Sequence, residues 1–148
     1  MRAKLNLGCG SLPERGWVNV DLAALPGVDV VHDLDVFPWP WADGAIERIK
    51  AYDVFEHIGR PLEFMRECHR VLRVSGILDI HTCFWRNQNA FTDPTHRRYC
   101  TEETFDYWIP GTYLHGRYGA AYAQGAHYER FKTELDGTEL AVLLGKLP

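Results

Sequence analysis

The sequence lacks both an excess of basic residues and a long apolar run. Its 148 residues contain 16 Lys and Arg against 20 Asp and Glu, which gives a formal net charge of −4. Proteins that bind the phosphate backbone concentrate positive charge, so neither DNA nor RNA is an expected partner. No apolar stretch is long enough to cross a membrane, and the N-terminus lacks the apolar core of a signal peptide. We therefore expect a cytoplasmic protein that binds no membrane.

Cysteine pairs are missing as well. Cys9, Cys68, Cys83 and Cys100 are widely spaced and form no Cys-x-x-Cys motif, which argues against a zinc ribbon and a dithiol redox site. Histidines lie next to or near two of these cysteines, but residues adjacent in sequence seldom converge on one ion. We expect four buried thiols and no metal site.

Repeats, linkers and low-complexity tracts are not found either. A content of 46% hydrophobic and 24% charged residues is typical of one globular domain. At this length, folding buries about 68% of the surface of the unfolded chain. We therefore expect residues 1–148 to form a single domain.

The N-terminal residues indicate a nucleoside-type cofactor. The alternating run from Lys4 to Leu7 predicts a strand, and it stops at Gly8 and Gly10, where the backbone can approach a ligand closely. A second strand, residues 17–20, ends at Asp21. An acidic residue at the carboxyl edge of a parallel sheet is suited to bind ribose hydroxyls.

Two further absences narrow this prediction. The segment from Gly8 to Pro13 lacks the third glycine of a dinucleotide-binding loop, which argues against pyrophosphate binding. Only residues 11–16 separate the first two strands, and they include Pro13, whereas a helical crossover needs about a dozen residues. We expect no helix longer than about one turn there.

The rest of the chain predicts further strands and one long helix. Strands are expected at residues 28–31, 46–52 and 77–82, with a turn at 37–44. The apolar spacing after Pro61 predicts a helix that ends near Ser75 and Gly76, with the glycine as its left-handed cap. A long loop follows at 84–99, and Thr101 is suited to cap a short helix through Trp108.

The C-terminal residues predict a hairpin and complete the fold class. Two strand-like segments, residues 127–135 and 138–144, flank Asp136-Gly137, a strong signal for a two-residue turn. The predicted fold is α/β: a doubly wound, mostly parallel sheet closed by an antiparallel C-terminal hairpin, with the first helix missing or very short.

Five blocks in this order resemble the class I S-adenosylmethionine-dependent methyltransferases, most closely the type 11 branch. The blocks are Leu5-Asn6-Leu7-Gly8-Cys9-Gly10, Asn19-Val20-Asp21-Leu22, Asp33-Leu34 with Phe37-Pro38-Trp39, Val54-Phe55-Glu56-His57-Ile58, and residues 67–76. They cover about the first 85 residues, and together they are specific, although no single block is.

The resemblance implies S-adenosylmethionine as cofactor and assigns residues to it. The glycine loop would meet the methionine part, Asp21 the ribose, and Asp33 with Leu34 the adenine. The implied cofactor residues are Leu7, Gly8, Cys9, Gly10, Asp21, Leu22, Asp33, Leu34, Tyr52 and Asp53.

The same resemblance implies an acceptor side after the fourth and fifth strands. His57, from the family's Glu-His pair, is our candidate catalytic base, because its unperturbed pKa near 6.5 suits proton uptake at neutral pH. A substrate-side insert is expected at residues 84–116, with Trp85, His96, Arg97 and Tyr99 as substrate residues and Tyr52 also on this side. Arg97 and Arg98 suggest an anionic group on a small acceptor, which would be methylated on oxygen or nitrogen.

Departures from the family pattern leave alternatives open. The family usually has an acidic residue at the position of Asn6, and Val74-Ser75-Gly76 replaces its Pro-Gly-Gly turn. A relative that binds the cofactor without turnover is therefore the second interpretation, and a nicotinamide-dependent oxidoreductase is the third. A second copy of the chain, in a homodimer, is a candidate for the wall that the lost helix would supply.

Overall fold

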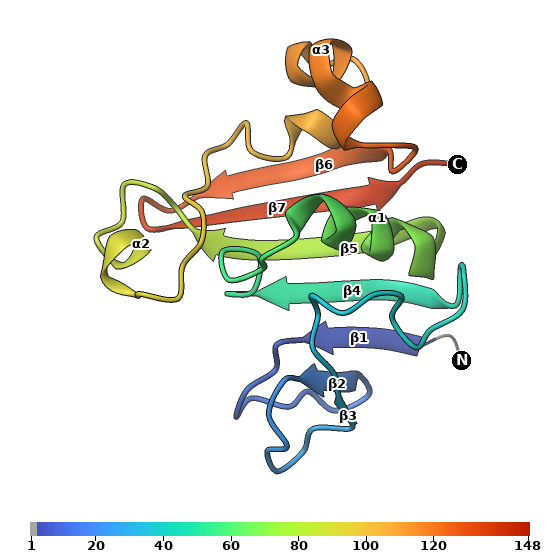
Figure 1. Cartoon of the computed structure of the whole chain (residues 1–148), viewed down its shortest axis with the longest axis vertical. Coiled ribbons are helices and arrows are strands. Elements are labelled where there is room, and N and C mark those ends of the chain that lie inside the picture. Colours follow the sequence, from blue (N-terminus) through green and yellow to red (C-terminus); the bar gives the residue numbers. More distant parts are fainter. Residues whose placement is uncertain (1–2) are drawn as a thin grey trace.

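Seven strands form one mixed sheet in a computed structural model that describes residues 3–148 (Figure 1). Its order is β3-β2-β1-β4-β5-β7-β6. The strands are β1 (Ala3–Leu7), β2 (Val18–Asp21), β3 (Val30–Val31), β4 (Ile46–Tyr52), β5 (Leu72–Cys83), β6 (Tyr128–Leu135) and β7 (Glu139–Lys146). Strands β1 to β5 pair in parallel, whereas β7 pairs antiparallel with β5 and β6. The predicted fold class is confirmed.

The strand order places a crevice where the predicted ligand residues lie. The chain leaves β1 toward β2 on one side, and β4 pairs with β1 on the other side. Ligands of such sheets bind outside the carboxyl ends of the strands at this reversal. The loops after β1, β2, β3 and β4 therefore meet at one edge of the sheet.

Residues 11–16 contain no helix, as predicted. A buried amide network holds this loop instead: Asn6 Nδ2 donates to Asn19 Oδ1 at 3.0 Å and to the Leu12 carbonyl at 3.4 Å. Asn19 in turn donates to Asp29 Oδ2 at 3.1 Å and accepts from the Glu14 N–H at 2.7 Å. The Asn6 side-chain NH₂ group therefore uses its hydrogen bonds to hold this loop.

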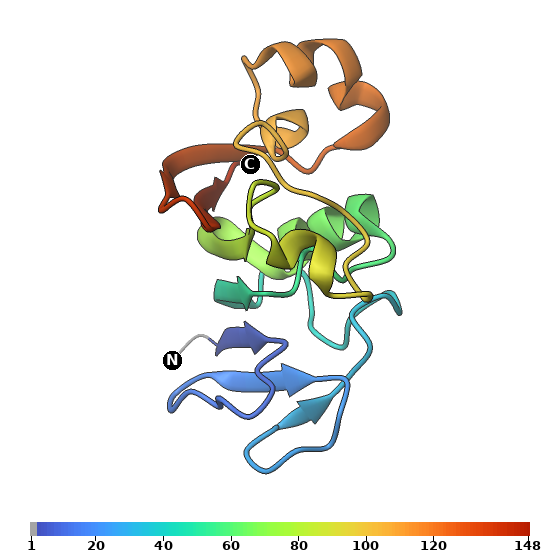
Figure 2. The ribbon, with the colours of Figure 1, turned by 90° about the vertical axis from the view of Figure 1, so that its left-hand side faces the viewer.

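The helix α1 (Pro61–Val71) joins β4 to β5 and covers one face of the sheet. Phe64, Met65 and Cys68 are buried, and Figure 2 shows the helix on one side of the strands. The predicted end near Ser75 and Gly76 is wrong. Leu72 is already extended and pairs with Ile46, because β5 begins there.

The residues after α1 also correct the predicted cap. Ser75, with φ +62°, takes the left-handed conformation, and Gly76 does not. A Cβ on Gly76 would lie 2.8 Å from the Arg73 carbonyl oxygen. Gly76 is thus needed because the Arg73 carbonyl comes close to its Cα. Apolar periodicity in the sequence cannot reveal such a contact.

The opposite face of the sheet carries polar side chains. In the part of the chain that the structure describes, no helix lies across this face (Figure 2). Tyr52 stacks on His81 with ring centroids 3.8 Å apart, and Arg48 pairs with Asp79 at 2.8 Å. Parallel sheets are normally covered on both faces, so paired charges and stacked rings replace the usual helices here.

The chain between β5 and β6 spans residues 84–127, longer than the expected insert at 84–116. It contains α2 (Asn89–Thr92), the 3₁₀ turn η1 (Asp106–Trp108) and α3 (Tyr113–Tyr122). Of the predicted helix from Thr101 through Trp108 only η1 forms, and its N-cap is Phe105. The sequence analysis missed α3, whose N-cap is Thr112.

The hairpin forms at the predicted place, and Asp136 Oδ1 accepts the N–H groups of Thr138 and Glu139 at 2.8 Å each.

Among the residues from 3 onward, no helix is long and apolar enough to cross a membrane.

Candidate functional site

A cavity of about 440 Å³, here called the cofactor cavity, opens at the carboxyl edge of β1 to β4. The predicted cofactor residues that line it are Gly8, Asp21, Leu22, Asp33, Leu34 and Asp53. It is also lined by His32, Asp35, Val54, His57, Ile58 and Arg97. Asp35 could have been found from its place two residues after Asp33, and Val54 and Ile58 from their places beside the Glu-His pair.

Gly8 brings the loop after β1 against the turn after β4. Its φ is +61°, and a Cβ there would lie 2.4 Å from Val54 Cγ2. No other residue fits both this conformation and this contact. The close approach lets the ends of β1 and β4 form one wall.

Asp21 is oriented by the backbone. Its Oδ2 accepts the Gly10 N–H at 2.8 Å, and its Oδ1 accepts the Ala23 N–H at 2.9 Å. Each carboxylate oxygen has a second lone pair, which leaves acceptors for ribose hydroxyls. Asp33 is held similarly, since its Oδ1 accepts the Asp35 N–H at 2.9 Å.

Four predicted cofactor residues do not line the cavity. Leu7 and Cys9 are buried, and the Cys9 thiol lies 3.7 Å from the Gly10 carbonyl oxygen. Gly10 contributes through its backbone N–H, which donates a hydrogen bond to the Asp21 carboxylate. Tyr52 lies on the polar face of the sheet and donates its hydroxyl to Asp79 at 3.3 Å, because side chains alternate along β4.

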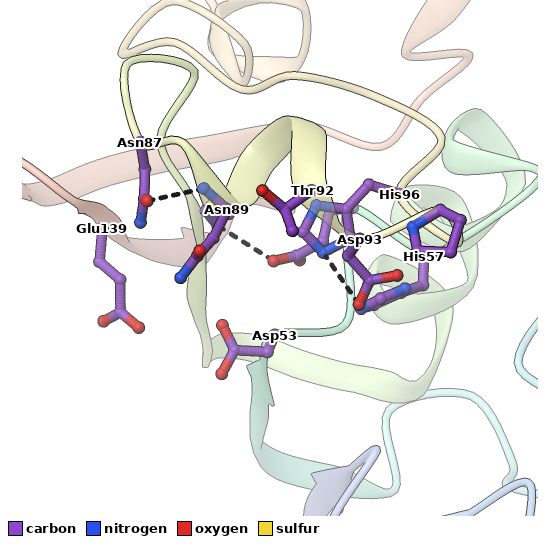
Figure 3. A pocket seen from close by; sticks show the side chains of 11 residues that line it. Asp53, His57, Asn87, Asn89, Thr92, Asp93, His96 and Glu139 are labelled. Carbon is purple, nitrogen blue, oxygen red and sulfur yellow. Dashed lines mark hydrogen bonds and ion pairs between the residues drawn. The ribbon is translucent and has the colours of Figure 1, made fainter.

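A second cavity, of about 580 Å³ and here called the acceptor cavity, adjoins the first (Figure 3). The two share Asp53 and His57 in their linings. The acceptor cavity is lined by Asp53, Glu56, His57, Cys83, Asn87, Asn89, Thr92, Asp93, Pro94, His96 and Glu139. Asp53 and His57 are therefore the residues at which the two cavities meet.

The acceptor cavity is acidic. Four carboxyl side chains line it, and among the described residues no Lys or Arg does. Burial raises the pKa of Asp53, and the neighbouring Glu56 carboxylate raises it further, while nearby histidines lower it. The cavity thus favours a neutral or cationic polar ligand.

Glu56 is buried and holds the end of β5 beside this cavity. Its Oε2 accepts the Thr82 hydroxyl at 2.9 Å, and its Oε1 accepts the Cys83 N–H at 3.0 Å. The Glu56 carbonyl accepts the Arg97 N–H at 2.8 Å. The glutamate of the Glu-His pair is therefore a positioning residue.

His57 is oriented from the 93–98 loop. Thr95 Oγ1 lies 2.6 Å from Asp93 Oδ1 and 2.9 Å from His57 Nδ1. Because the hydroxyl donates its one proton to the carboxylate, it accepts from Nδ1–H of the imidazole. This fixes the tautomer and leaves His57 Nε2 with a free lone pair.

Of the predicted substrate residues, only His96 lines the acceptor cavity. Arg97 lines the cofactor cavity instead, and Arg98 donates to the carbonyls of Phe55 and Ile58. Trp85 and Tyr99 are exposed and line neither cavity, since Tyr99 stacks on Phe91 with centroids 4.4 Å apart. Arg97 thus belongs to the cofactor cavity and Arg98 fastens the loop, and neither arginine lines the acceptor cavity.

Comparison with known proteins agrees with this architecture. Residues 15–80 match the type 11 family model described as "Methyltransferase domain". No curated protein sequence matches the chain significantly.

Solved structures share the fold at low sequence identity. An S-adenosylmethionine-dependent methyltransferase from Archaeoglobus fulgidus is 15% identical, with a TM-score of 0.69 over 98% of this chain and 86% of that chain. The [4+2]-cyclase SpnF is 15% identical, with a TM-score of 0.65, and the match covers 99% of this chain and 75% of that chain. A putative methyltransferase of Haloferax volcanii, in complex with the Trm112 activator, is 13% identical, with a TM-score of 0.56, and the match covers 99% of this chain and 83% of that chain.

These comparisons confirm the resemblance and the fold that the sequence predicted. They also support S-adenosylmethionine as the cofactor, in agreement with the cavity at the strand ends.

Proposed function

We propose that this chain transfers the methyl group of S-adenosylmethionine to a small polar acceptor, because residues 15–80 match the type 11 methyltransferase model and the fold is that of a solved methyltransferase. The observation that supports this most directly is the meeting of the two cavities at Asp53 and His57. Methyl transfer needs the acceptor atom in line with the sulfur–methyl bond at near-contact distance. Two cavities that meet at shared residues would let a cofactor in one and an acceptor in the other approach each other there.

The cofactor would lie along the ends of β1 to β4. Asp21 and Asp33 line this cavity and are held by backbone N–H groups, and they would bind the ribose and the adenine, as the resemblance implies. The sulfonium carries a positive charge, and Asp53 at the shared wall would attract it. Arg97 is an exposed cation over this cavity and would meet an anionic group there rather than on the acceptor.

The acceptor would be a neutral or cationic molecule with an oxygen or nitrogen nucleophile. The carboxylates of the acceptor cavity repel an anion, so an anionic acceptor needs a further cation in the cavity. His57 Nε2 is free to accept the proton that the nucleophile loses, because Nδ1 is held by Thr95.

A nicotinamide cofactor fits the site less well. Residues 11–16 form no helix, so the glycine loop has no helix N-terminus to bind a pyrophosphate. The fold alone does not establish turnover, since it also occurs in a cyclase.

Calorimetric titration with S-adenosylmethionine, S-adenosylhomocysteine and NAD tests the cofactor assignment. We expect the first two to bind at one site per chain and NAD not to bind. NAD binding without S-adenosylmethionine binding would contradict the proposal. Formation of S-adenosylhomocysteine with a panel of small hydroxyl and amine acceptors tests turnover, and binding without turnover on any acceptor would favour the non-catalytic interpretation.

A further inference from the structure

Three metal-ligating side chains meet at one end of the acceptor cavity. His57, Asp93 and His96 each offer one ligand atom, and these atoms lie within 4.8 Å of one another (Figure 3). His96 Nε2 is 3.9 Å from Asp93 Oδ2. Ligands of one ion at bonds of about 2.1 Å lie roughly 3 to 3.5 Å apart, so small side-chain rotations would bring the three together.

Hydrogen bonds prepare the two histidines for this role. His96 Nδ1 lies 3.1 Å from the Ala90 carbonyl oxygen, which can only accept, so Nδ1 carries the proton and Nε2 a lone pair. The Thr95 hydroxyl fixes the same tautomer in His57. Metal-bound histidines are typically held in this way, with the second ring nitrogen donating to a carbonyl or another oxygen.

Asp93 is held in the same manner. Its Oδ1 accepts the N–H and the hydroxyl of Thr95 at 2.8 and 2.6 Å, which leaves Oδ2 for another partner. One threonine thus orients two of the three side chains.

We propose that His57, His96 and Asp93 bind a divalent transition-metal ion, of which Zn²⁺ is the best match, at the acceptor end of the site. Two imidazoles and one carboxylate, with the remaining positions open to the cavity, form the donor set of a catalytic zinc site. Mg²⁺ prefers ligand sets made of oxygen and matches this set poorly. The other carboxylates of the cavity would strengthen the attraction for the cation.

This inference rests on the proposed function for its chemical meaning. An ion at this position would bind the acceptor oxygen or nitrogen at its open positions and lower the pKa of that group, so that its proton would pass to solvent water rather than to His57. It would also compensate the negative charge of the cavity, which allows an acceptor with an anionic group. No local pattern in the sequence indicates this site, because His57 lies 36 residues before Asp93, on the other side of β5.

Titration of metal-free protein with ZnCl₂ and with MgCl₂ tests the site directly. We expect one Zn²⁺ per chain by calorimetry and elemental analysis, and no comparable binding of Mg²⁺. His96→Ala should weaken Zn²⁺ binding about a hundredfold or more, since one ligand of three is lost. Thr95→Val keeps all three ligands and should weaken binding about tenfold to a hundredfold, the usual effect of removing an orienting group.

His81→Ala is the matched control. His81 lies on the polar face of the sheet, 3.6 Å from Asp79, and lines neither cavity. We expect Zn²⁺ affinity as in the parent, and circular dichroism should show that every variant is folded. The proposal is wrong if the parent binds no Zn²⁺, or if His81→Ala lowers affinity as much as His96→Ala does.

A parallel titration of S-adenosylmethionine into chelator-treated protein separates this inference from the proposed function. Cofactor binding without Zn²⁺ binding would overturn the metal site alone. Zn²⁺ binding without cofactor binding would overturn the proposed function and leave the metal site.

Discussion

The two cavities are built in different ways. The cofactor cavity is formed by consecutive strand ends, and apart from Arg97 its lining lies between residues 8 and 58. The acceptor cavity joins the turn after β4 to the 83–96 segment and to Glu139 on β7. One is therefore made by local chain order along a parallel sheet, and the other by contacts between distant segments.

The polar groups of the two cavities also differ in what orients them. Asp21 and Asp33 in the cofactor cavity are fixed by backbone N–H groups. In the acceptor cavity, Glu56 accepts the Thr82 hydroxyl as well as the Cys83 N–H, and His57 is oriented by the Thr95 hydroxyl, so side chains share this role with the backbone. A substitution of the exposed Thr95 can therefore alter the acceptor cavity at little cost to the fold, whereas the carboxylates of the cofactor cavity are tied to the backbone.

The largest effect is expected from Gly8→Ala, which breaks the wall of the cofactor cavity. The new Cβ would lie 2.4 Å from Val54 Cγ2, in a backbone conformation with φ +61°. Left-handed strain and overpacking together should lower the free energy of unfolding by about 2 to 5 kcal/mol. Urea unfolding measures this loss.

Gly10→Ala is its control. Gly10 also has a positive φ, +51°, but no atom lies within 4 Å of the position of its Cβ. Only the backbone strain remains, so we expect a loss of about 1 to 2 kcal/mol. Equal losses in the two variants would show that the contact with Val54 does not shape the cavity.

Asp21→Ala should weaken S-adenosylmethionine binding about tenfold to a hundredfold. A charge-assisted hydrogen bond contributes roughly 1.5 to 3 kcal/mol, and the substitution removes the carboxylate proposed to bind the ribose. Because Asp21 does not line the acceptor cavity, Zn²⁺ affinity should not change. Calorimetry measures both. Parent-like cofactor affinity in a folded Asp21→Ala variant would refute the ribose assignment.

Asn6→Asp restores the acidic residue of the family pattern and should lower stability by about 1 to 2 kcal/mol. The carboxylate cannot donate to Asn19 Oδ1 or to the Leu12 carbonyl, so it would face two acceptors in a buried position. Cofactor affinity should not rise, since Asn6 lines neither cavity. Tighter binding of S-adenosylmethionine would instead mean that the asparagine weakens the site.

The contrast between the cavities explains how much the sequence could predict. Strand ends and glycines are local signals, so the sheet, the missing first helix and residues such as Gly8 and Asp21 could be predicted from the sequence. The acceptor cavity depends on how the 84–100 loop folds back, and no local pattern shows that Arg98 fastens it to the Phe55 carbonyl. For the same reason, the sequence does not show that Trp85 and Tyr99 line neither cavity.

The smallest expected effect concerns the charge of Asp53, which lines both cavities where they meet. Its pKa is raised, by burial first and then by Glu56, whereas His57, His81 and His96 lower it. At neutral pH the ionised carboxylate would attract the sulfonium, and this attraction is lost as the pH falls through the raised pKa. We expect the S-adenosylmethionine affinity of the parent protein to fall about threefold as the pH falls from neutral through this raised pKa.

Asp53→Asn separates these contributions. Asp53 has φ +53°, and asparagine is the residue of similar shape that tolerates this conformation best, so the fold should be retained. The variant should bind S-adenosylmethionine about threefold more weakly than the parent at neutral pH, because it lacks the charge. The difference should vanish at acidic pH, where the parent carboxyl is protonated. If parent and variant show the same affinity at every pH, the sulfonium does not lie at the junction, and the cofactor occupies its cavity in another direction.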